Sequence, residues 1–103
     1  MNEETTIHPY ADLLGIELEE HEDGSSTCSL AVSEKLLNPH RVVHGGVLYS
    51  LADTGMGAAL YPSLGPDEIC ATIEIKINYF RPVASGSIRC LTELVHRGKR
   101  VAN

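Results

Sequence analysis

The segment from His44 to Tyr61 constrains the fold most, because a glycine pair opens a stretch that is apolar on nearly every side. Apolar residues occupy all faces of the helix that Gly46 to Tyr61 would form, which predicts a helix buried in the core. Pro62 should end this helix. Asp53, its one acid, stands near the middle. Burying a carboxylate without a partner is costly, so this acid favours a role in reactive chemistry.

The segments around this helix carry signals for shorter elements. We expect a short opening helix that Gly15 stops, a β-hairpin, a loop at Asn38-Pro39, and two antiparallel strands after the long helix. Their expected ranges are 9–14 for the helix, 16–19 and 28–32 for the hairpin, and 72–80 and 88–95 for the later strands. A helix enclosed by apolar contacts needs a sheet curved around it, so the expected class is α+β.

Composition excludes several functions. With 103 residues, the sequence suits a single domain over 1–103. A net charge of −6 without basic runs argues against nucleic-acid binding. The apolar stretch from Gly45 to Tyr61 is short for a membrane span, and the polar N-terminus is no signal peptide. Cysteines occur without a CxxC pair, which is typical of reduced thiols in the cytoplasm; they are Cys28, Cys70 and Cys90.

A narrow seam of small or polar residues follows one side of the predicted helix. Gly46, Ser50, Asp53 and Gly57 are spaced by four, three and four residues, which places them on one stripe. Such a seam on a buried helix suits a substrate cleft. The structural alternative stays open: small residues would then allow close packing, and Asp53 would pair with a distant arginine.

The start of the helix offers a second candidate group. Gly45 and Gly46 stand where free N–H groups and the positive end of the helix dipole can stabilise an oxyanion, although such a pair can also serve only for flexibility. Eight helical residues separate Gly45 from Asp53, a rise of roughly 12 Å. Two groups that act on one carbonyl must both lie about 3 Å from the reacting atoms. A site using both must therefore join two subunits, which predicts a dimer.

Two segments also carry a resemblance to a known family. One is Asn38, then five residues, then His44-Gly45-Gly46-Val47-Leu48-Tyr49-Ser50-Leu51-Ala52-Asp53; the other runs from Ala71 to Pro82. Together they resemble the signature of hotdog-fold acyl-CoA thioesterases of the phenylacetate-pathway (PaaI-like) branch. The resemblance implies a hotdog fold, in which a curved antiparallel sheet wraps one long central helix. It also implies a homodimer or a dimer of dimers (a homotetramer), with active sites at the dimer interface.

The resemblance further implies an enzyme that hydrolyses the thioester of an aryl- or fatty-acyl-CoA without a cofactor. Asp53 would be the nucleophile or general base, and the Gly45 N–H would polarise the thioester carbonyl. An Asp in this position, rather than a Glu, favours the PaaI-like branch over the hydroxybenzoyl-CoA and dihydroxynaphthoyl-CoA types. The remaining implied roles are orientation of the carbonyl or the water by Asn38, contact of His44 with the thioester sulfur, positioning of water by Thr72, and contact of Arg81, Lys99 and Arg100 with the CoA phosphates.

Strand parity complicates the role of Thr72. On a regular strand Thr72 would share a solvated face with Glu74 and Lys76, so its contact with the site requires a strand end or a bend. Family members also continue beyond the position of Asn103 with one or two more strands. We therefore expect the hotdog domain in this sequence to be C-terminally incomplete, or completed by a partner chain.

Two other functions compete with the enzyme. A non-catalytic hotdog module that binds acyl-CoA as a ligand sensor would be expected to lose the acid, so the presence of Asp53 favours catalysis. A metal site at His40 and His44 would need a helical segment there, and Pro39 with the glycine pair argues against one. We expect no metal.

Overall fold

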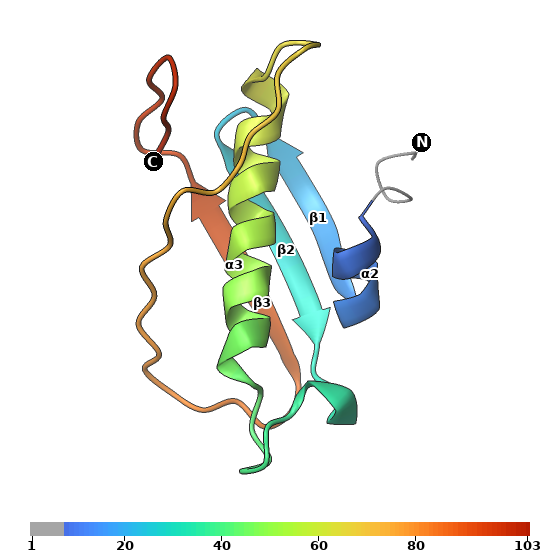
Figure 1. The fold of residues 1–103 in the computed structure, drawn as a ribbon. Coiled ribbons are helices and arrows are strands. Elements are labelled where there is room, and N and C mark those ends of the chain that lie inside the picture. The colour runs from blue at the N-terminus through green and yellow to red at the C-terminus, as the bar shows by residue number, and fades with distance from the viewer. Residues whose placement is uncertain (1–7) are drawn as a thin grey trace.

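A three-stranded antiparallel sheet and one long helix form two layers in the computed structural model, which describes residues 8–103. The strands lie in the order β1-β2-β3, and the helix α3 crosses one face of the sheet (Figure 1). A short helix, α2, lies beside β1. The bounds are Pro9–Leu14 for α2, Ile16–Glu22 for β1, Ser25–Ala31 for β2, Glu34–Leu36 for the 3₁₀ helix η1, Gly45–Leu60 for α3, Tyr61–Ser63 for the 3₁₀ helix η2 and Ser87–Glu93 for β3. The predicted α+β class is confirmed.

The opening helix and the hairpin form where local signals predict them. Gly15 ends α2 in the left-handed conformation (φ 83°), which glycine adopts without strain. Gly24 (φ 93°) supplies the tight turn between β1 and β2. On the other side of β2, Cys28 is directly opposite Cys90 of β3. β2 is therefore the central strand of the sheet.

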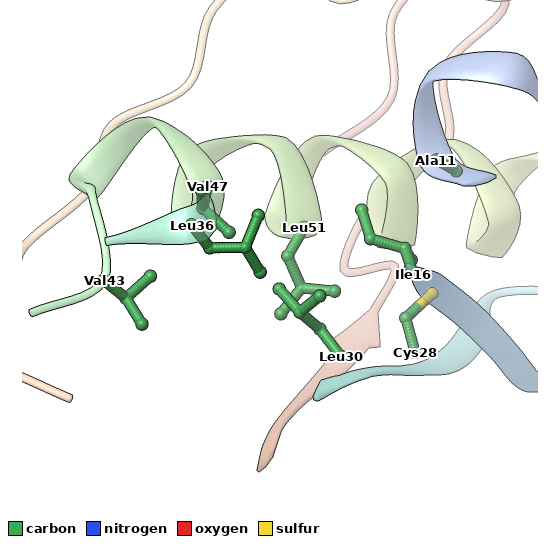
Figure 2. Packing of buried hydrophobic residues seen from close by; sticks show 8 residues of the cluster. All are labelled: Ala11, Ile16, Cys28, Leu30, Leu36, Val43, Val47 and Leu51. Atoms are coloured by element: carbon green, nitrogen blue, oxygen red, sulfur yellow. The ribbon is translucent and has the colours of Figure 1, made fainter. Parts of the chain in front are cut away.

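The core lies between α3 and the sheet, as Figure 2 shows. The buried residues of α3 recur every four positions on one stripe; they are Val47, Leu51, Gly55 and Ala59. They face β2, where Cys28 and Leu30 are 0% and 1% exposed. Hydrophobic burial between these two layers is the main stabilising contribution to this part of the chain.

The expectation that α3 is enclosed on every side is wrong for the part of the chain that the structure describes. Tyr49 and Met56, on other sides of the helix, are 41% and 39% exposed. The physical reason is that one face of a three-stranded sheet covers only one stripe of a helix. Apolar composition alone does not determine how many faces are covered.

Close packing between α3 and the sheet depends on Gly55. The Ser26 hydroxyl of β2 donates to the Gly55 carbonyl at 2.7 Å, and both groups are buried. A Cβ atom at Gly55 would lie 2.8 Å from Thr92 Oγ1 and 3.3 Å from Cys90 Sγ. The helix therefore approaches β2 and β3 more closely than an alanine would permit.

The prediction of a strand at 72–80 is wrong. This segment is extended, but it pairs with no strand in residues 8–103, and it runs outside the sheet on the side of β3 (Figure 1). An extended segment becomes a strand only when a neighbour pairs with its backbone N–H and C=O groups. A regular strand would bury every second side chain of this segment, and only part of that pattern is present. Ile75 and Ile77 are half-buried, whereas Ile73 is 80% exposed.

The chain after β3 forms a small loop beside the C-terminal end of α3. Arg97 and Ala102 form an isolated bridge, and Arg97 Nε donates to the Ser63 hydroxyl of η2 at 3.3 Å. No helix within the described range 8–103 is both long enough and apolar enough to span a membrane.

Candidate active site

His44 caps the start of α3 and leaves one amide free. Its Nδ1 accepts the Gly46 N–H at 2.8 Å, and its carbonyl accepts the Val47 N–H at 2.9 Å. An accepting Nδ1 carries no proton, so the neutral ring in this arrangement is protonated at Nε2. The Gly45 N–H has no acceptor in residues 8–103. Gly45 therefore supplies the amide of the first turn that is available to a ligand.

Asn38 holds the loop that leads into the helix. Its side-chain oxygen accepts the backbone N–H groups of His40 at 2.9 Å and Val42 at 3.3 Å. Its own N–H donates to the Val42 carbonyl at 2.7 Å, which closes a tight turn with Arg41 at φ 66°. Because the side-chain oxygen is used within the turn, the amide NH₂ is the group that Asn38 can offer to a carbonyl or a water molecule.

A groove of about 290 Å³ lies at the start of α3. Its lining consists of Val42, Val43, Gly45, Leu48 and residues 79–83. Most of these side chains are apolar, and the polar groups belong to the Gly45 backbone, the Tyr79 hydroxyl and Arg81. An apolar groove with a few polar groups suits an organic ligand that carries a charged end.

Another groove, of about 300 Å³, lies where β1, β2 and β3 reach the hairpin turn. Three carboxylates line it; they belong to Glu20, Glu22 and Glu93. Negative side chains repel a phosphate-bearing ligand, so this groove is a poor candidate for binding CoA.

Asp53 lies half-buried on the seam predicted from the sequence. That seam is on the opposite side of α3 from the stripe that packs on the sheet. The Thr72 hydroxyl donates to Asp53 Oδ1, and the hydroxyl of Ser50, also on the seam, is 3.0 Å from that of Tyr10. No arginine or lysine lies within 4.0 Å of the Asp53 carboxylate in the described part of the chain. The alternative in which Asp53 pairs with a distant arginine therefore has no support here.

The contact of Thr72 with Asp53 meets the condition set by strand parity. Residues 72–80 form no regular strand, so the face of Glu74 and Lys76 does not dictate where the Thr72 side chain lies. Glu74 and Lys76 instead form an exposed ion pair with each other at 3.5 Å. The irregular backbone brings a hydroxyl to the one acid of α3.

The three basic residues expected to contact the CoA phosphates lie in two separate places. Arg81 lines the groove at the start of α3. Lys99 and Arg100 are exposed in the C-terminal loop, which Arg97 ties to η2 beyond the other end of the helix. Among residues 8–103, no carboxylate lies within 4.0 Å of these three cationic groups. Because the groove with Arg81 and the loop with Lys99 and Arg100 lie at opposite ends of α3, one chain does not bring these three residues together around a single ligand.

Gly45 and Asp53 belong to the same unbroken helix. Eight residues of α-helix hold them roughly 12 Å apart along its axis. Within one chain, the free amide and the carboxylate cannot both lie about 3 Å from the same reacting carbonyl.

The sequence did not single out Tyr79, which falls within the strand expected at 72–80. The Tyr79 hydroxyl donates to the Gly45 carbonyl at 2.9 Å, across 34 residues of sequence. Tyrosine chemistry gave only a general signal, because a partly buried tyrosine commonly hydrogen-bonds through its hydroxyl, and it did not identify the partner. His40 and His44 lie in the loop and at the helix cap, not on one helical face.

Comparison with known proteins gives consistent matches. Residues 40–103 match the family described as "Thioesterase superfamily". The 1,4-dihydroxy-2-naphthoyl-CoA hydrolase of Listeria monocytogenes is 33% identical over 88 residues, with coverage of 85% of this chain and 72% of that protein. The acyl-coenzyme A thioesterase PaaI of Escherichia coli is 33% identical over 91 residues, with coverage of 87% of this chain and 63% of that protein.

A solved structure agrees with these matches. That of a conserved protein from Pseudomonas aeruginosa superposes with a TM-score of 0.88 at 38% identity. The match covers 96% of this chain and 79% of the other. The central helix and the antiparallel sheet thus have a close counterpart in an independently determined structure.

Proposed function

The chain belongs to the thioesterase superfamily and has its hotdog fold, and from this we propose that it hydrolyses the thioester of an aryl- or fatty-acyl-CoA. The observation that carries the proposal is the half-buried carboxylate of Asp53, which accepts a hydrogen bond from Thr72. Two relatives whose names specify an acyl-CoA substrate support it. They are equally similar in overall identity, so the aspartate itself is what favours a PaaI-like substrate.

Two routes are open to this carboxylate. As a general base, Asp53 takes a proton from water, and the hydroxide attacks the thioester carbonyl carbon. The carbonyl oxygen becomes an anion that accepts the Gly45 N–H; the C–S bond then breaks, and the CoA thiolate is protonated. As a nucleophile, Asp53 attacks the same carbon itself and releases CoA, and water then hydrolyses the resulting anhydride. In both cases the products are a carboxylic acid and CoA.

The remaining site residues act on binding and orientation. The Asn38 amide orients the carbonyl or the water, Thr72 holds the carboxylate, and His44 fixes the glycine turn and contacts the thioester sulfur through its ring. The groove at the start of α3 supports this arrangement because Gly45 and Arg81 share it. Arg81 is therefore suited to a CoA phosphate while the acyl group lies against the apolar lining.

The proposed site joins two subunits, as a homodimer or a dimer of dimers. The roughly 12 Å between Gly45 and Asp53 supports it, because Gly45 of one subunit must meet Asp53 of the other. In a two-fold arrangement, the start of each α3 then points toward the far end of its partner. Lys99 and Arg100 of one subunit would thereby approach Arg81 of the other, so all three could contact one CoA. The three free cysteines suit the cytoplasm as the setting of this reaction.

Thiol release from a panel of phenylacetyl-, benzoyl- and hexanoyl-CoA tests the proposal, comparing wild type with Asp53→Asn. Losing a catalytic acid or base costs about 10²- to 10⁴-fold in rate, which is the expected loss in kcat. Asp67→Asn is the matched control, because Asp67 is exposed in the turn that follows η2. We expect that variant to keep wild-type turnover.

Undiminished turnover in Asp53→Asn would refute the mechanism. Absence of turnover in the wild type, together with retained CoA binding by calorimetry, would instead identify a non-catalytic binding module.

A further inference from the structure

The Gly45–Gly46 peptide is held at both of its polar ends. Its carbonyl, on Gly45, accepts the Tyr79 hydroxyl at 2.9 Å. Its N–H, on Gly46, donates to His44 Nδ1 at 2.8 Å. Glycines have the widest conformational freedom of all residues, so side-chain contacts add to the first turn of α3 in keeping this peptide in one orientation. Here two side chains from separate segments of the chain supply those contacts.

The Tyr79 ring also lies against the glycine. A Cβ atom added at Gly45 would be 3.2 Å from Tyr79 Cζ and 3.3 Å from its hydroxyl oxygen. Tyr79 and Gly45 line the same groove, and the tyrosine is 52% exposed. The ring therefore forms a wall of the groove directly beside Gly45.

We propose that Tyr79 is a positioning residue for catalysis: its hydroxyl fixes the Gly45–Gly46 peptide and thereby directs the Gly45 N–H into the groove. This inference rests on the proposed function, in which that N–H stabilises the oxyanion. The Gly45 N–H belongs to the preceding peptide, which meets the Gly45–Gly46 peptide at the Gly45 Cα. Holding the Gly45–Gly46 peptide in one orientation therefore restricts φ and ψ of Gly45, which set the direction of its N–H relative to the helix. Oxyanion stabilisation depends on donors being held in place before charge develops.

Tyr79→Phe tests the inference, because it removes the hydroxyl and keeps the ring contact. A neutral hydrogen bond of this kind predicts a fall in kcat of about 3- to 10-fold, with KM within about 2-fold of wild type. Amide exchange measured by NMR should show faster exchange at Gly46, whose peptide has lost one of its two side-chain hydrogen bonds. The matched control is Tyr61→Phe, since Tyr61 is 55% exposed at the far end of α3 and should change neither quantity.

Wild-type kcat in Tyr79→Phe would overturn the inference, and so would a lower kcat without any change in Gly46 exchange. A rise in KM alone would point to substrate binding and would also contradict it. If the wild type released no thiol from any acyl-CoA, the proposed function would fail first. Exchange at Gly46 would then still decide, independently of activity, whether the hydroxyl holds the peptide.

Discussion

The Thr72 hydroxyl donates a hydrogen bond to a carboxylate oxygen of Asp53, which joins the irregular segment after η2 to the middle of α3. Hydrogen bonds to an ionised acceptor are stronger than neutral ones, and they orient the acceptor. We expect Thr72→Val, which keeps the shape of the side chain and loses the hydroxyl, to lower kcat for thioester hydrolysis about 10-fold.

Thr72→Ser is the control for this effect. Serine keeps the donor, so its kcat should remain close to wild type. Equal activities of the valine and serine variants would show that the hydroxyl is not needed. Melting curves of both variants should be compared, so that a loss of activity is not mistaken for unfolding.

Gly45→Pro should remove the proposed oxyanion donor while leaving the helix intact. Proline has no N–H and is well tolerated at the first helical position. His44, the residue before it, is extended (φ −61°, ψ 136°), as a following proline requires. Loss of one oxyanion donor predicts a fall in kcat of about 100-fold or more.

Gly45→Ala controls for the added atoms. Alanine brings the same Cβ to 3.2 Å from the Tyr79 ring but retains the N–H. The ratio of kcat between the alanine and proline variants therefore measures the contribution of the amide. A ratio near one would contradict the role assigned to Gly45.

Mixed dimers test whether the site is shared between subunits. When Asp53→Asn and Gly45→Pro chains combine, one of the two sites in each mixed dimer has both an intact Gly45 and an intact Asp53. Random exchange makes half of the dimers mixed, so activity should recover to roughly a quarter of wild type. Mixing Asp53→Asn with the double variant should recover none. Failure of the first mixture to recover, with exchange verified by mass spectrometry, would place the whole site in one chain.

Local sequence signals predicted the elements that depend on local contacts. The opening helix has the expected bounds, and α3 begins and ends one residue earlier than the expected Gly46 to Tyr61. The strand at 72–80 could not be predicted correctly, because strand pairing depends on a distant partner that alternation does not reveal. The burial of α3 was overestimated for a similar reason: covering a helix depends on how many strands lie against it.

The candidate site shows the same division. Spacing alone identified the seam of Asp53 and the separation between Asp53 and Gly45. The resemblance, and not the spacing, included Thr72 in the site, with the role of positioning water; its hydrogen bond to the Asp53 carboxylate was not predicted. The contact of Tyr79 with Gly45 was not predicted, because a hydroxyl bonded to a backbone carbonyl leaves no pattern in the sequence.

Cys28 and Cys70 should react with iodoacetamide at very different rates. Burial, together with the opposite Cys90 and the nearby Glu19, raises the pKa of the Cys28 thiol from 9.0 to about 11. The thiolate is the reactive form, so Cys28 should stay unlabelled in the native protein at about pH 8, while the exposed Cys70 reacts. Both should be labelled in urea, which peptide mass spectrometry can show.

The same shift in the pKa of Cys28 predicts how stability depends on pH. The unfolded thiol loses its proton near its ordinary pKa, whereas the folded thiol keeps it until about 11. The contribution is therefore fully present below pH 9.0 and declines as the pH rises toward 11. Urea midpoints that fall equally in wild type and Cys28→Ala across this window would contradict this contribution.

Gly55 and Gly57 of α3 should respond to alanine in opposite directions. A Cβ atom at Gly57 has no neighbour within 4 Å, so Gly57→Ala should stabilise the protein by about 0.5–1 kcal/mol through helix propensity. At Gly55 the Cβ would lie 2.8 Å from Thr92 Oγ1, and such overpacking costs about 1–3 kcal/mol. Urea unfolding of both variants measures the difference. If the contact with Thr92 causes the loss, Thr92→Ala should partly restore the stability of Gly55→Ala; stabilisation by Gly55→Ala alone would show that the two layers can separate at little cost.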